Sequence, residues 1–119
     1  MAAPNLKNPT TVTGKTKSYA ATTVVTSFLE NPAASNKVLK INSVYCANIN
    51  GINAVDVELY FNDGTTNYAL AFQISIPARA TQVLLTRDAY IYIEEGGSLR
   101  AKGSSTGGLN LTVGYEEIG

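Results

Sequence analysis

Residues 55–76 read VDVELYFNDGTTNYALAFQISI, and this stretch decides how the chain folds. In residues 55–61 apolar side chains alternate with Asp56, Glu58 and Tyr60, the period-two pattern of a strand with one buried face. The next four residues, Asn-Asp-Gly-Thr, are typical of a tight turn because glycine adopts positive φ at little steric cost. Residues 68–76 alternate again. The stretch therefore predicts a β-hairpin with its apolar residues on one side.

Similar segments recur on both sides of this hairpin, separated by turn signals rich in Gly, Pro, Asn and Ser. The expected strands are residues 19–29, 37–49, 81–93, 98–102 and 109–118, with 81–93 interrupted by the polar residues 86–88. Apolar positions change parity within 37–49, which indicates a bulge or burial of both faces. Roughly seven strands without a convincing amphipathic helix predict an all-β fold, either a single antiparallel β-sandwich or a jelly-roll-like domain.

The chain has 119 residues, which fits one domain. Residues 1–17 are polar and contain Pro4, Pro9 and Gly14, so they predict an extended N-terminal arm with room for one strand near Thr11 to Thr13. Residues 18–119 are expected to form the β-sandwich domain.

Composition excludes several classes of function. Nine Lys and Arg balance nine Asp and Glu, whereas a nucleic-acid-binding protein is expected to carry a basic excess. No run of 18 apolar residues predicts a membrane span. The chain has no His and a single Cys, so it cannot build a Ser-His-Asp or Cys-His pair, a His-ligated metal site or a cysteine-rich zinc site. We therefore expect no enzyme, no cofactor, no metal, and neither nucleic acid nor membrane as partner.

Two features remain that could carry chemistry. Asp56 and Glu58 project from the same face of their strand and could act as an acid–base pair or bind Ca²⁺. A solvated strand face is the favoured interpretation, because the outward face of a half-exposed strand is polar by default. Cys46 falls in an expected strand, and a free cysteine there is typical of the core.

The chain contains seven Tyr against three Phe. Tyr60 lies on the polar face of its strand, and Tyr90 and Tyr92 share one face of theirs. Exposed tyrosines are typical of protein interfaces and of sugar-binding platforms, and packing within the sheet is a third alternative. The bias alone does not choose among these.

Several segments together resemble one group of proteins. They are AAPNL (2–6), TVTGKT (11–16), ENP (30–32), KINS (40–43), IYIEEGGSL (91–99) and GYEEI (114–118). This pattern is similar to that of small virion structural proteins of tailed bacteriophages, especially phages of marine cyanobacteria. The resemblance implies a non-enzymatic particle component, made in the host bacterial cytoplasm and placed on the virion surface. It assigns no role to any residue.

Such a component is expected to be a capsid decoration, or cement, subunit that binds the major capsid protein. Alternatives are a neck, tail or baseplate part, and a carbohydrate-binding module that uses Tyr60 or Tyr92 with the loop 103–108. We expect a homo-oligomer such as a trimer, since a chain without net charge can pack densely against its own copies. The residues expected to bind partners are Pro4, Asn5, Leu6, Lys7, Val12, Tyr60 and Tyr92.

Overall fold

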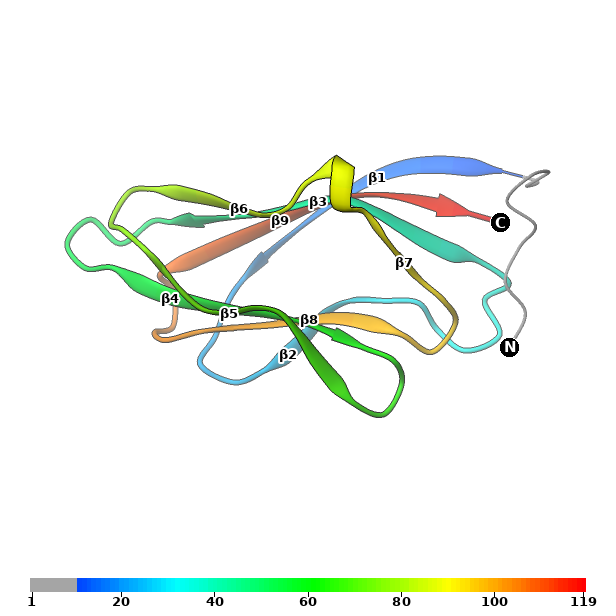
Figure 1. Cartoon of the computed structure of the whole chain (residues 1–119), viewed down its shortest axis with the longest axis horizontal. Coiled ribbons are helices and arrows are strands. Elements are labelled where there is room, and N and C mark those ends of the chain that lie inside the picture. The colour runs from blue at the N-terminus through cyan, green and yellow to red at the C-terminus, as the bar shows by residue number, and fades with distance from the viewer. Residues whose placement is uncertain (1–10) are drawn as a thin grey trace.

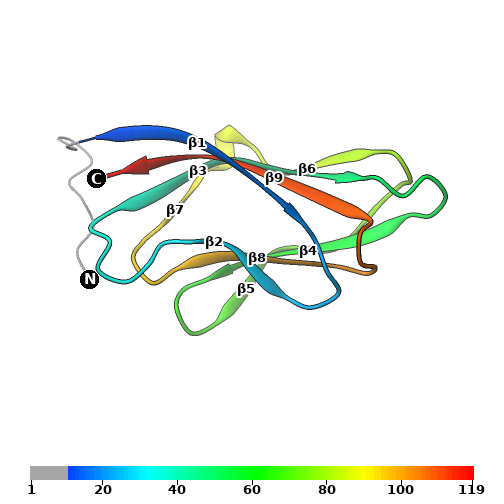
Figure 2. The ribbon, with the colours of Figure 1, turned by 180° about the vertical axis from the view of Figure 1, so that it is seen from behind.

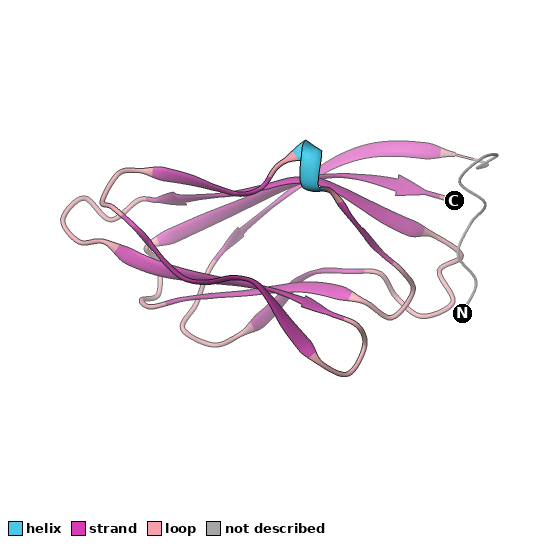
Figure 3. Cartoon of the chain, viewed as in Figure 1, coloured by secondary structure: helices cyan, strands magenta, loops and turns pink. Residues whose placement is uncertain are grey.

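The computed structural model describes residues 11–119, and in this range it is a two-layer β-sandwich (Figures 1 and 3). The described elements, in chain order, are β1 (Val12–Ala20), β2 (Thr26–Glu30), β3 (Val38–Asn48), β4 (Val55–Asn62), β5 (Asn67–Ile76), β6 (Thr81–Leu85), the 3₁₀ turn η1 (Arg87–Ala89), β7 (Ile91–Ile93), β8 (Ser98–Gly103) and β9 (Leu109–Ile118). Sheet I has the strand order β1-β9-β3-β6, and β7 also pairs with β3. Sheet II has the order β2-β8-β4-β5. The all-β prediction is confirmed.

The hairpin predicted from residues 55–76 is the tip of a much longer one. β4 pairs with β5 at the tip, β3 with β6 and β7, β2 with β8, and β1 with β9, all antiparallel. Successive pairs alternate between the two sheets, so the long hairpin is rolled up with the first and last strands side by side (Figure 2). This winding is that of a jelly roll, in which two antiparallel sheets enclose one core.

The core fills the space between the sheets. Sheet I contributes side chains such as Ile41 and Leu111, and sheet II contributes Leu59 and Leu99, all with no exposed surface. Each fully buried aliphatic side chain stabilises the fold by about 1.5–3 kcal/mol relative to exposure. The alternation that predicted the inward face of β4 is confirmed at Val55, Val57 and Leu59.

Other boundaries differ from the sequence expectation. Residues 19–29 do not form one strand, because β1 ends at Ala20 in sheet I and β2 begins at Thr26 in sheet II. The parity change in residues 37–49 is caused by a bulge between Ile41 and Ser43, one of the two predicted alternatives. The break within residues 81–93 is also present, where η1 separates β6 from β7.

Part of the segment expected to be an extended arm, residues 1–17, forms a strand. Residues 12–17 belong to β1 and pair with β9, from Val12 opposite Ile118 to Lys17 opposite Val113. The strand foreseen near Thr11 to Thr13 is thus a full edge strand. An edge strand is held by its backbone hydrogen bonds, so it does not need the apolar side chains by which buried strands are recognised. Residues 1–10 lie outside the described residues.

Candidate interaction surfaces

Only part of the expected partner-binding set can be located. Pro4, Asn5, Leu6 and Lys7 lie outside the described residues. Val12 is exposed at the start of β1. The chain enters β1 beside its own C-terminus, since the Thr11 amide donates to the Gly119 carbonyl at 3.0 Å and the Gly119 amide donates back at 2.9 Å.

Tyr60 and Tyr92 lie on different sheets. Tyr60 belongs to β4 in sheet II, and Tyr92 belongs to β7 in sheet I, opposite Lys40. The loop after β8 is anchored on β4, because Ser104 exchanges two hydrogen bonds of 2.9 Å with the backbone of Asp56, four residues before Tyr60. Tyr60, Tyr92 and this loop therefore do not form one platform.

Tyr60 belongs to a polar cluster on sheet II that it forms with Glu58 and Lys102. Its hydroxyl donates a hydrogen bond to Oε1 of Glu58, and this bond raises the pKa of Tyr60 to about 12, with burial and the nearby negative charge adding to the effect. Lys102, directly opposite Glu58 on β8, places its Nζ 3.9 Å from Oε2. The hydroxyl that could bind a partner is thus engaged within the sheet.

The carboxylates noted in the sequence share one shallow depression. Asp56 and Glu58 line it together with Gln73, Lys102 and Ser104, and its volume is about 220 Å³. Glu58 is only 8% exposed, so the solvated face predicted for it is wrong at this position. Glu58 is tolerated in this half-closed place because the register of β4 against β8 sets Lys102, an opposite charge, directly across from it.

Gln73 enters this depression from a bulge in β5. Two residues of β5 face Glu58 where the register shifts between Val57 and Leu59. Gln73 adopts φ 52°, a left-handed conformation that is uncommon for a residue with a side chain. The bulge breaks the regular alternation of β5, which the sequence pattern did not reveal.

Two exposed tyrosines at β7 of sheet I, Tyr90 and Tyr92, form a compact aromatic cluster. The rings of Tyr90 and Tyr92 pack edge to face with centroids 5.6 Å apart, and the Nζ of Lys40 lies 4.5 Å from the Tyr90 ring centroid. Both geometries are favourable, the second through the attraction of a cation to the ring face. Tyr92 remains 38% exposed, so the cluster is available to a partner.

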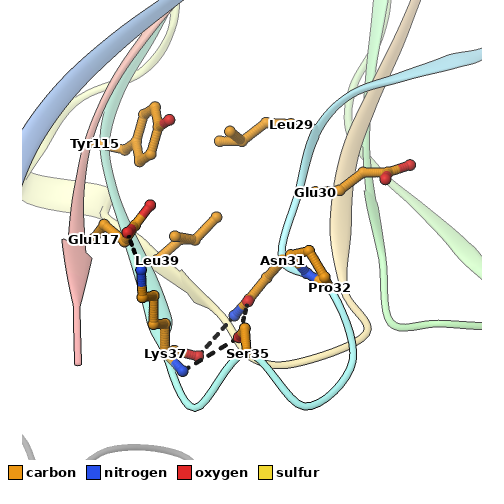
Figure 4. A pocket seen from close by; sticks show the side chains of 9 residues that line it. All are labelled: Leu29, Glu30, Asn31, Pro32, Ser35, Lys37, Leu39, Tyr115 and Glu117. Atoms are coloured by element: carbon orange, nitrogen blue, oxygen red, sulfur yellow. Dashed lines mark hydrogen bonds and ion pairs between the residues drawn. The ribbon is translucent and has the colours of Figure 1, made fainter.

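A groove of about 420 Å³ opens between the sheets beside the end of β9 (Figure 4). Leu29, Leu39 and Tyr115 supply its apolar walls. Glu117 accepts hydrogen bonds from Lys37 at 2.6 Å and from Lys15 at 2.9 Å, and these lysines, Lys37 first, hold the pKa of Glu117 below its usual value.

The loop that borders this groove is fixed by Asn31, which is 2% exposed (Figure 4). Its Nδ2 donates to the carbonyls of Lys37 at 2.8 Å and Ile93 at 2.9 Å, and its Oδ1 accepts a hydrogen bond from Ser35. One amide thus joins the loop before β3 to the end of β7.

The most extensive apolar exposure lies on β5. Of its alternating residues only Ile76 is buried, whereas Tyr68, Leu70, Phe72 and Ile74 are 54%, 38%, 56% and 37% exposed. The expectation that the hairpin hides all its apolar residues on one side is therefore wrong for β5. The register against β4 shifts twice, so Ala71 rather than Leu70 or Phe72 lies opposite the buried Leu59 and packs against the core.

Cys46 is fully buried in β3, as predicted for a core thiol, and burial raises its pKa to about 12. Within residues 11–119 no group of three or more His, Cys, Asp and Glu side chains could hold a metal ion. No helix in this range is long and apolar enough to cross a membrane. No family model matches the chain, and no curated protein matches it significantly.

Proposed function

We propose that this chain is a non-enzymatic structural subunit of a tailed-bacteriophage particle, and that it binds the lattice of the major capsid protein as a decoration, or cement, subunit. The observation that supports an assembly role is the apolar and aromatic exposure on strands of both sheets. Phe72 on β5 and Tyr92 on β7 are examples, and both belong to strands of the sandwich. Large apolar side chains that gather in solvent are typical of interaction sites. The phage assignment is supported by the sequence resemblance.

Two properties that a decoration subunit needs are compatible with this chain. Each subunit binds a repeating lattice, so a modest contact per copy is multiplied by avidity. Only 15% of the residues are charged and the net charge is zero, which limits repulsion between neighbouring copies. The rigid jelly roll would form the body of the subunit.

Quantitative mass spectrometry of purified virions tests the proposal. Particles of the phage that encodes the chain should contain it in a copy number comparable to that of the major capsid protein. A few copies per particle would instead indicate a neck, tail or baseplate component. Absence of the chain from purified virions would overturn the proposed function.

A truncation tests whether the N-terminal segment, which contains the expected partner-binding residues 4–7, is needed to bind the capsid. A variant without residues 2–10 retains Thr11 and its backbone pair with Gly119, so the edge of sheet I stays intact. We expect this variant to fold and to lose binding to particles that lack the chain, whereas the full-length chain binds them. Undiminished binding of the truncated chain would contradict the role of the arm.

The aromatic cluster on sheet I favours a second candidate, a carbohydrate-binding module on the virion surface. Tyr90, Tyr92 and Lys40 present ring surface and a cation at one exposed place. A glycan array probed with the wild type, with Tyr92→Ala and with Tyr60→Ala as control decides the matter. Binding that only Tyr92→Ala abolishes would support this candidate, and an array without a hit would contradict it.

A further inference from the structure

The starting observation is that β5 is a long edge strand without charged residues. Among the described residues it pairs with β4 alone, at one end of sheet II. Its ten residues, NYALAFQISI, include no charged side chain and no proline. Edge strands of monomeric proteins are commonly protected by charges, by proline, by bulges or by a covering segment. Of these devices β5 has bulges: its register against β4 shifts on both sides of Ala71, once near Gln73 and once near Leu70.

The other sheet edges differ in charge. β1 carries Lys15 and Lys17, and β2 carries Glu30. β6 is uncharged like β5, but it is half as long, with five residues. The longest uncharged edge of the sandwich is therefore also the strand with four large, exposed apolar side chains, Tyr68, Leu70, Phe72 and Ile74.

The absence of charge has a specific consequence for contacts between identical copies. About a two-fold axis the same patch meets itself, so every charge in the patch meets a like charge nearby. A contact of β1 with itself would bring Lys15 and Lys17 of one copy near those of the other. A contact of β5 with itself brings only apolar and neutral side chains together, and it carries no such repulsion.

We propose that β5 is the contact surface between two copies of this chain, related by a two-fold axis, with Tyr68, Leu70, Phe72 and Ile74 at its centre. The two register shifts near Leu70 and Gln73 interrupt the strand, so the contact rests on these apolar side chains rather than on one continuous hydrogen-bond ladder. This inference deepens the proposed assembly function, because it names the surface through which copies join.

Sedimentation velocity of the purified chain over a range of concentrations tests the contact. We expect a reversible dimer. Phe72→Lys and Leu70→Lys each place a charge beside its own symmetry mate, so each should raise the dimer Kd at least about tenfold. Val24→Lys and Ile52→Lys are matched controls, since both residues are exposed and lie in loops outside β5, and they should leave the Kd unchanged.

A charge-reversal pair guards against misfolded variants. Phe72→Lys and Phe72→Glu should both be monomeric alone, with far-UV circular dichroism like that of the wild type, and should form a heterodimer when mixed. A monomeric wild type, a trimer, an unchanged dimer in the β5 variants or an equal effect in the controls would overturn the proposal. The experiment uses no virions, so absence of the chain from virions would overturn the proposed function and leave this contact standing.

Discussion

Glu58 in β4 lies directly opposite Lys102 in β8, with 3.9 Å between the Lys102 Nζ and the Glu58 Oε2. The other carboxylate oxygen accepts a hydrogen bond from the Tyr60 hydroxyl. The alternation of β4 predicts that the Glu58 carboxylate faces water, but in the structure it is paired with side chains of sheet II. Two partners, one from the next strand in space and one from its own strand, replace the water that an 8% exposed carboxylate has lost.

Removing the Tyr60 hydroxyl should change how stability depends on alkaline pH. The pKa of Tyr60 is raised to about 12 in the folded chain, against about 10 for an unfolded tyrosine. Between these pH values the unfolded chain loses a proton that the folded chain keeps, so stability falls as the pH rises through this window. Urea unfolding of Tyr60→Phe should therefore show a shallower decline there than the wild type. Tyr45→Phe, at an exposed position, is the control, and equal slopes in both variants would contradict the assignment.

The two leucines of the tip hairpin should respond differently to truncation. Leu59 in β4 has no exposed surface, and Leu59→Ala should cost about 2–5 kcal/mol of unfolding free energy through lost burial and the cavity left behind. Leu70 in β5 is 38% exposed, and Leu70→Ala should cost less than about 1 kcal/mol in the monomer. Chemical denaturation at low protein concentration measures both. Similar losses would mean that β5 is covered in the monomer.

Replacing Asn31 should loosen the end of the sandwich. Asn31→Ala leaves the carbonyls of Lys37 and Ile93 without their donor, which costs about 1–3 kcal/mol for buried groups. Hydrogen exchange should also become faster in the loop between β2 and β3. Asn110→Ala, at an exposed position in β9, is the matched control and should have little effect. Equal stability of the two variants would refute the structural role of Asn31.

The ion pairs of Glu117 should contribute a small, acid-sensitive stabilisation. Lys37 and Lys15 lower its pKa in the folded chain, so the stabilisation is complete above the unfolded pKa of about 4.3 and is lost as the pH falls through the lower folded value. Both lysine side chains are more than 40% exposed, which screens the pairs and limits the effect to about 1 kcal/mol. Glu117→Gln should be less stable than the wild type at neutral pH and equal to it in strong acid or high salt. A difference that persists in acid would assign the effect to packing.

Local pattern predicted much of the fold because the strands of this chain are short and alternate. The turn after Asn62 and the alternation in β4 specify the tip of the rolled hairpin, and the polar interruption before Tyr90 marks η1. The sequence did not predict β1 between Gly14 and Ser18, because an edge strand held largely by backbone pairing does not need a pattern of apolar residues. Which sheet each strand joins was not predictable either, since it depends on partners far along the chain.

The sequence by itself determined the all-β class, the hairpin that starts the roll, the inward face of β4 and the burial of Cys46, because each follows from the order of apolar and polar residues along a strand. Tertiary structure alone decided that Glu58 faces Lys102, that Tyr60 and Tyr92 lie on separate sheets, and that β5 shows its apolar residues to solvent. The reason is physical: alternation tells which residues share a side only while a strand is regular, whereas the bulges of β5 and the packing of the two sheets depend on residues far along the chain.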